Sequence, residues 1–226
     1  MTAHSRSALV GLMAVVLVAL TGCTPGAGDP TPTSTLTESA TSTPTASPEP
    51  DAPVAAAVVV TSRTLTVLDE AGGELLVLDY LGDGAAAAES LATALGDDPV
   101  VTTTAGVGSG CDTDQAMYDF GGVLLRDPGF VGTTAAFEVE VSGATTRAGL
   151  PIETLGGQAV GATRAGFLAA VPDAFEMFDN GGGNVTVGFD VIDPTVAEYD
   201  RTGSIAIFGG DRLAEIITPH YLFGDC

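Results

Sequence analysis

Short runs of alternating apolar and polar residues, separated by Gly and Asp, constrain this fold most strongly. A period of two puts every second side chain on one face of a β-strand, and turn residues between such runs favour antiparallel pairing. We expect hairpin turns at residues 70–73 and 209–211 and another turn at 179–184. The sequence predicts strands at residues 56–61, 64–69, 74–80, 137–141, 185–191, 204–208 and 213–218.

Two segments have helical periodicity instead. Residues 85–95 carry an apolar stripe, with Asp83 as the N-cap and Gly96 and Pro99 after the end. The stripe consists of Ala88, Leu91, Ala92 and Leu95. Residues 163–171 repeat this arrangement, with Thr163 as the cap and Pro172 as the stop; the side chains expected to be buried are Phe167, Leu168 and Val171.

The predicted fold class is therefore α+β, with antiparallel sheets and two short helices. Leu95 and Val171 lie 76 residues apart at corresponding places, and each helix precedes several strands. This spacing suggests two tandem helix-plus-sheet units within residues 54–226, with halves at 54–142 and 143–226. Chance similarity between two amphipathic helices is the alternative. Gly82-Asp-Gly84 we interpret as a helix cap and not as a dinucleotide-binding turn.

The first 22 residues have the pattern of an export signal. Arg6 precedes an apolar run at residues 8–20, which is shorter than the roughly 20 residues that a membrane-spanning helix needs. Leu20-Thr21-Gly22-Cys23 resembles the lipobox of bacterial lipoproteins. That resemblance implies a diacylglyceryl group on Cys23 and a mature chain that begins there. Two acyl chains, palmitate being typical, would give a stable anchor on the extracytoplasmic face of the cell membrane. An ordinary signal peptide with an incidental Cys is the alternative.

Residues 23–53 join this anchor to the folded part. They are rich in Thr and Ser and contain seven of the 13 Pro residues, with almost no large apolar side chain. Such a composition predicts a disordered, solvated spacer, which sugars could also modify. The whole chain carries 29 acidic residues against seven Arg, a formal charge of -22. This charge excludes nucleic acid as a partner, because phosphates would be repelled.

If Cys23 is acylated, Cys111 and Cys226 are the two remaining thiols. In an oxidising compartment we expect them to form a disulfide. A metal site or a reactive thiol is the alternative, but there is neither a Cys-x-x-Cys motif nor a Cys/His cluster. The sequence predicts no cofactor.

Few residues could perform catalysis. The folded part has one His, His220, and no Lys, and Ser109 is not in a Gly-x-Ser-x-Gly elbow. No EF-hand spacing is present, so we predict no metal site. Asp112, Asp114 and Asp119 are nevertheless the first place to look for calcium, which takes oxygen ligands.

The segment from Gly157 to Thr163, followed by the helix, Pro172 and strands, resembles the opening of SmpA/OmlA-type envelope lipoprotein modules. The tandem arrangement is similar to that of the secreted β-lactamase inhibitory proteins. Both resemblances imply a non-enzymatic module that binds proteins on a sheet face. The chain departs from them in having no Trp and 6% aromatic residues, so no contact residue is carried over. More broadly, it resembles uncharacterised lipoproteins of Gram-positive bacteria.

These observations predict a membrane-anchored, non-catalytic lipoprotein. It would meet a protein or another envelope partner through an exposed sheet face or loop, because the folded part lacks the convergent titratable groups that chemistry needs. The alternative is a lipoprotein that binds a small ligand or a cation such as Ca²⁺. A hydrolase built around His220 is the third reading.

Overall fold

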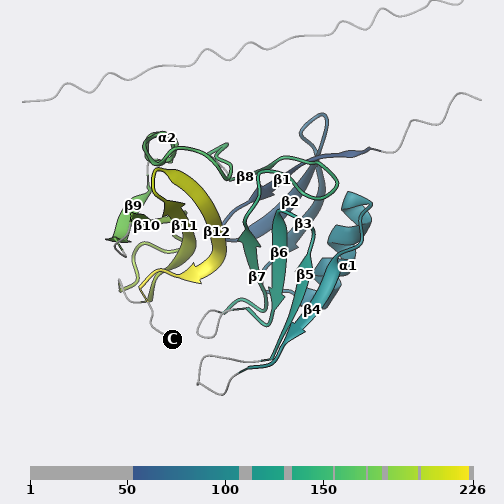
Figure 1. Cartoon of the computed structure of the whole chain (residues 1–226). Helices are drawn as coiled ribbons and strands as arrows, with labels where there is room; N and C mark the ends of the chain where they lie inside the picture. The colour runs from purple at the N-terminus through teal and green to yellow at the C-terminus, as the bar shows by residue number, and fades with distance from the viewer. Residues whose placement is uncertain are drawn as a thin grey trace, which may run out of the picture. The chain divides into compact units, whose positions relative to one another are not determined.

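The computed structural model of the chain (Figure 1) describes residues 53–106, 114–129, 134–154, 156–171, 173–179, 183–197 and 200–223. The predicted export signal, the lipobox-like segment with Cys23 and the predicted spacer up to residue 52 lie outside these residues, as do Cys111 and Cys226. No helix in the described part of the chain is long and apolar enough to cross a membrane.

The smaller of two sheets has four strands. Their order is β3 (Glu74–Asp79), β2 (Thr64–Asp69), β1 (Ala55–Val60) and β8 (Ile152–Thr154). The first three pair antiparallel, as the turn residues predict, and β8 pairs parallel to β1. The hairpin turn at 70–73 is confirmed: Asp69 accepts hydrogen bonds from the backbone N–H groups of Ala71 and Gly73, and Gly72 has a φ of 79° that suits glycine.

The larger sheet has eight strands, all antiparallel to their neighbours. Its first half contains β4 (Val100–Thr104), β5 (Gln115–Asp119), β6 (Val123–Asp127) and β7 (Glu138–Val141). Its second half continues with β12 (Arg212–Tyr221), β11 (Thr202–Gly209), β10 (Asn184–Phe189) and β9 (Phe175–Asp179). Five strands were not predicted from the sequence, namely β4, β5, β6, β8 and β9.

Both predicted helices are confirmed, together with their caps. In α1 (Gly84–Leu95), the Asp83 side chain accepts from the N–H of Ala86 at 2.8 Å, and Gly96 ends the helix with a positive φ. In α2 (Arg164–Ala170), the Thr163 hydroxyl accepts from the N–H of Gly166 at 3.1 Å. Each cap satisfies a backbone donor that the first helical turn leaves unpaired.

Gly84 also explains the small residues at the start of α1. A Cβ at this position would lie 2.7 Å from the Cβ of Asp127, at the end of β6, so the close approach of helix and strand requires glycine. The strands on either side of α1 pair only antiparallel. The interpretation of Gly82-Asp-Gly84 as a packing and capping element agrees with this geometry.

The same order of elements occurs twice along the chain. After α1, strands β4 to β7 pair in succession, and after α2, strands β9 to β12 do the same. The two four-stranded segments meet where β7 pairs with β12, through Val141 and Ile216, Glu140 and Ile217, and Val139 and Thr218. The result is a sheet-rich α+β fold in which helices form a small part.

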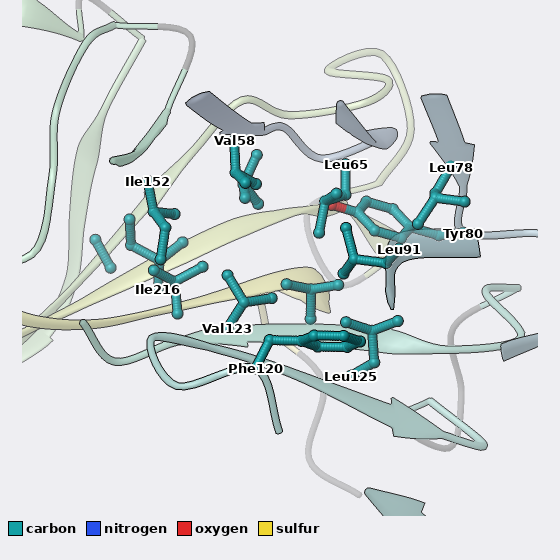
Figure 2. Close-up of a cluster of buried hydrophobic side chains, with 14 of the residues drawn as sticks. Val58, Leu65, Leu78, Tyr80, Leu91, Phe120, Val123, Leu125, Ile152 and Ile216 are labelled. Carbon is teal, nitrogen blue, oxygen red and sulfur yellow. The ribbon is translucent and has the colours of Figure 1, made fainter. Parts of the chain in front are cut away.

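One hydrophobic core joins both sheets and both helices. Figure 2 shows Val58, Leu65 and Leu78 of the small sheet and Leu91 of α1 gathered with side chains of the large sheet. Each buried aliphatic side chain contributes about 1.5–3 kcal/mol. In α2, Phe167 is fully buried and packs edge-to-face on Phe189 and Phe208, at centroid distances of 5.1 and 5.6 Å.

Candidate functional site

The strongest candidate site lies on the face of the large sheet opposite this core. In β6 and β7, Val123, Leu125, Val139 and Val141 point into the core and are at most 1% exposed. Because side chains alternate along a strand, the residues between them point to the other face. These are Leu124, Arg126, Glu138 and Glu140.

Strand register extends this face on both sides. Glu140 lies opposite Leu124 on β6 and Ile217 on β12, and Arg126 lies opposite Met117 on β5. Glu215 is two residues before Ile217 and so shares its face. We call this surface the acidic face; it consists of Met117, Leu124, Arg126, Glu138, Glu140, Glu215 and Ile217.

Charge on the acidic face is unbalanced. Arg126 donates a hydrogen bond to Glu140 through its terminal nitrogen, while its Nε is buried and has no hydrogen-bond partner among the described residues. The side chains of Glu140 and Glu138 are only 16% and 5% exposed. One guanidinium therefore stands among three carboxylates in a partly dehydrated environment, where charge repulsion is stronger than in water.

Glu215 shows the effect of this imbalance. Burial raises the pKa of its carboxyl group, and the negative charge of Glu140 raises it further, with smaller contributions from a hydrogen bond to Glu140 and from the charge of Glu138. Arg126 acts in the opposite direction but does not cancel these effects. Glu215 therefore binds its proton more tightly in the folded protein than an isolated glutamate side chain does.

His220 joins this cluster through an irregularity in β12. Gly203 pairs with His220 and Ile205 with Ile217, so β12 has one extra residue at this point. Such a bulge re-aims the side chains that follow it. The Nδ1 atom of His220 lies 3.2 Å from Oε2 of Glu138, and its side chain is 18% exposed. A hydrolase would need this imidazole, which contacts the buried carboxylate of Glu138. Ser109 lies outside the described residues.

The carboxylates named for calcium do not form one site. Asp114 precedes β5 and Asp119 ends it, which separates them by about 17 Å along an extended strand, too far to share an ion. Asp114 accepts from the N–H of Gly106, and Asp119 accepts from the N–H of Gly121. Asp114 and Asp119 therefore do not share an ion, and Asp112 lies outside the described part of the chain. No group of three metal-ligating side chains occurs among the residues that the structure describes.

A cavity of about 320 Å³ lies where strands of both sheets meet. Its lining includes Arg63, Asp79, Leu81 and Pro219, with the buried Tyr80 at one wall. The hydroxyl of Tyr80 donates to the carbonyl of Thr61, and burial raises its pKa, so it stays neutral. This volume is at the lower end of small-molecule pockets.

The predicted lipidation of Cys23 and the predicted disulfide between Cys111 and Cys226 fall outside the described residues and stay predictions. Comparison of the chain with models of known families, with curated proteins and with solved structures found no match. The geometry of the chain itself therefore carries the functional argument.

Sequence reasoning missed the acidic face, although part of its signal was present. The alternation in residues 137–141 already puts Glu138 and Glu140 on one side of a strand. The residues around Arg126 and Glu215 do not indicate that their strands lie on either side of residues 138–141. The order of strands in the sheet decides which strands are neighbours.

Proposed function

We propose that this chain is a membrane-anchored extracytoplasmic lipoprotein whose folded part is a non-catalytic interaction module that binds a basic protein through the acidic face. The observation that carries the proposal is the set of three partly buried carboxylates, Glu138, Glu140 and Glu215, with the single guanidinium of Arg126 among them. A partly buried carboxyl group with a raised pKa, such as that of Glu215, is typical of functional sites.

A basic partner would correct the charge imbalance. An Arg or Lys side chain that entered the face would pair with carboxylates that now repel each other, and hydrogen bonds between ionised groups contribute about 1.5–3 kcal/mol each. Leu124 and Ile217 lie beside Glu140 and supply apolar surface that excludes water from such a pair. Met117 extends this apolar surface beside Arg126.

The tandem-unit interpretation gives a reason for a binding surface at this position. The acidic face spans the pairing of β7 with β12, where the segment that follows α1 meets the segment that follows α2. In a duplicated module, the junction of the two units is a surface that neither unit has alone. The lipid on Cys23 and the spacer at 23–53 would hold this surface away from the membrane. The resemblance to sheet-face-binding modules points to the same role.

Site-specific photocrosslinking on intact cells tests the proposal. A photoreactive residue at Ile217 should capture one defined protein with a basic surface, whereas the same residue at Glu70, in the exposed turn between β2 and β3, should not. The double substitution Glu140→Gln and Glu215→Gln should reduce capture about 10- to 100-fold. Glu70→Gln with Glu89→Gln changes the net charge equally and should leave capture unchanged. Equal capture from both positions would contradict the proposal.

Binding of a small ligand in the 320 Å³ cavity is the second candidate. The cavity combines a guanidinium, a carboxylate and apolar side chains, the mixture that orients small polar molecules. A ligand that raises the melting temperature of the wild-type protein, but not of an Ala135→Phe variant that fills the cavity, would favour this function. If the same ligand also raises the melting temperature of the double variant Glu140→Gln and Glu215→Gln, the ligand binds in the cavity and not at the acidic face.

A further inference from the structure

A second surface, independent of the acidic face, is the edge of the large sheet that β4 forms. The two sheets end in four edge strands, β3, β8, β4 and β9. An edge strand exposes backbone N–H and C=O groups that can pair with another chain, so natural proteins shorten, bend or charge their edges. The four edges of this protein differ sharply in this respect.

Three of the edges carry such protection. Strand β8 is only three residues long. Strand β3 has an extra residue in its ladder with β2 and begins and ends with the carboxylates of Glu74 and Asp79. Strand β9 also has an extra residue, in its ladder with β10, and carries Glu176, which lies 3.7 Å from Arg164. Bulges and charges of this kind discourage further pairing.

Strand β4 has neither a bulge in its ladder nor a charged residue within the strand. All five of its residues are β-branched, uncharged and exposed, with Val100 and Val101 at 54% and 56%. Its ladder with β5 runs without interruption from Val100 opposite Asp119 to Thr104 opposite Gln115. Figure 1 shows β4 as the outermost strand of its half of the large sheet. The edge is regular and has a high β-propensity, so it suits a further strand.

Carboxylates flank β4 at both ends. Asp97 and Asp98 lie before the strand, separated from Val100 by Pro99, and Asp114, next to β5, accepts from the N–H of Gly106 just beyond Thr104. Arg147 lies 3.3 Å from Asp97 and donates to the carbonyl of Asp98. Both ends therefore keep a negative side chain, Asp98 at one end and Asp114 at the other, and both residues are exposed.

We propose that β4 accepts an extended segment of another protein as an additional strand, and that this segment has β-branched residues in its centre and Lys or Arg on both sides. Charge complementarity selects such a partner over a second copy of the chain. In antiparallel self-pairing, the Asp98 end of one copy meets the Asp114 end of the other, and in parallel self-pairing each end meets itself. Either alignment juxtaposes like charges, which is unfavourable across paired strands.

Hydrogen exchange on the full chain in detergent tests this assignment. The probes are two synthetic peptides of alternating Val and Thr, one with two lysines at each end and one with two glutamates. The lysine peptide should protect the amides of β4, while those of β9 exchange as before. It should bind at least about tenfold more tightly than the glutamate peptide. Absence of protection in β4 would overturn the proposal that this edge accepts a strand.

Charge reversal tests the selectivity. In the double variant Asp98→Lys and Asp114→Lys, the preference should invert toward the glutamate peptide. The control Glu70→Lys and Asp211→Lys makes the same change in net charge at the turns between β2 and β3 and between β11 and β12, and should keep the wild-type preference. Equal effects of both pairs would show that only the total charge matters and would overturn the assignment of Asp98 and Asp114.

A pair of proline variants tests whether backbone pairing carries the binding. Neighbouring residues in a strand point their N–H groups in opposite directions. One of the variants Thr102→Pro and Thr103→Pro therefore removes an N–H that points inward and donates to β5. The other removes an N–H that points outward, toward the open edge. The variant that keeps the wild-type melting temperature has lost only the outward donor. It should no longer bind the lysine peptide; unchanged binding by that variant would overturn strand addition.

Discussion

The ionisation of a carboxyl group on a sheet face depends on its neighbours, and Glu215 shows this most clearly among the described residues. Burial and the charge of Glu140 favour its protonated form in the folded protein, whereas the unfolded chain leaves it near the ordinary pKa of 4.5. The folded state therefore binds this proton more tightly than the unfolded state does. Folding stability is linked to pH through that difference.

The sign of the linkage gives a prediction. The stability that Glu215 contributes as a protonated group is present in full below pH 4.5 and is lost as the pH rises through the raised pKa. The melting temperature of Glu215→Gln should therefore exceed that of the wild type by an increasing amount as the pH is raised from 4.5 to neutrality. A difference between the two proteins that is constant over this range would contradict the raised pKa.

At the scale of elements, the sequence predicts best where local chemistry and tertiary environment agree. Strand β2 has the predicted bounds because its apolar residues Leu65 and Val67 are fully buried and turn residues flank the strand. Both helices begin at the predicted caps because Asp83 and Thr163 satisfy donors of their own first turns. Such features depend on residues that are near one another in the chain.

The missed strands lack that agreement. Strand β4 is exposed on both faces, so its Val-Val-Thr-Thr-Thr sequence shows no alternation, although its β-branched composition was an available signal. Strand β8 is too short for a period to be detected. The contact of His220 with Glu138 of the acidic face depends on an extra residue in β12 opposite β11, which no local pattern in the sequence specifies.

The edge of β4 also gives a prediction at this scale. If Asp98 and Asp114 prevent self-pairing, the double variant Asp98→Asn and Asp114→Asn should associate through β4 at concentrations where the wild type does not, because Asn removes the charge and keeps the polar group. Protection of the β4 amides that grows with protein concentration would report it. Added salt should shift the wild type in the same direction. A variant that showed no such protection at any concentration would count against the role given to these two residues.

At the scale of the whole molecule, the two regions that each contain a helix and four strands share one core and one large sheet. The predicted disulfide would add a covalent link between residues 111 and 226. Closing a loop of that length contributes about 4–5 kcal/mol in the chain-entropy model. The native protein should therefore run faster on non-reducing than on reducing gels, and Cys111→Ser should abolish the difference. Alkylation of both thiols without reductant would disprove the bond.

The place of β12 in the sheet bears on the order in which this domain folds. It follows every other strand in the described part of the chain, yet it lies inside the large sheet, between β7 and β11. A chain that has been synthesised only up to β11 can form the small hairpins, but it cannot close the sheet across its middle. Closure of the large sheet must therefore wait until residues 212–221 are available, and a chain that stops before residue 212 would leave two open edges where β7 and β11 should be covered.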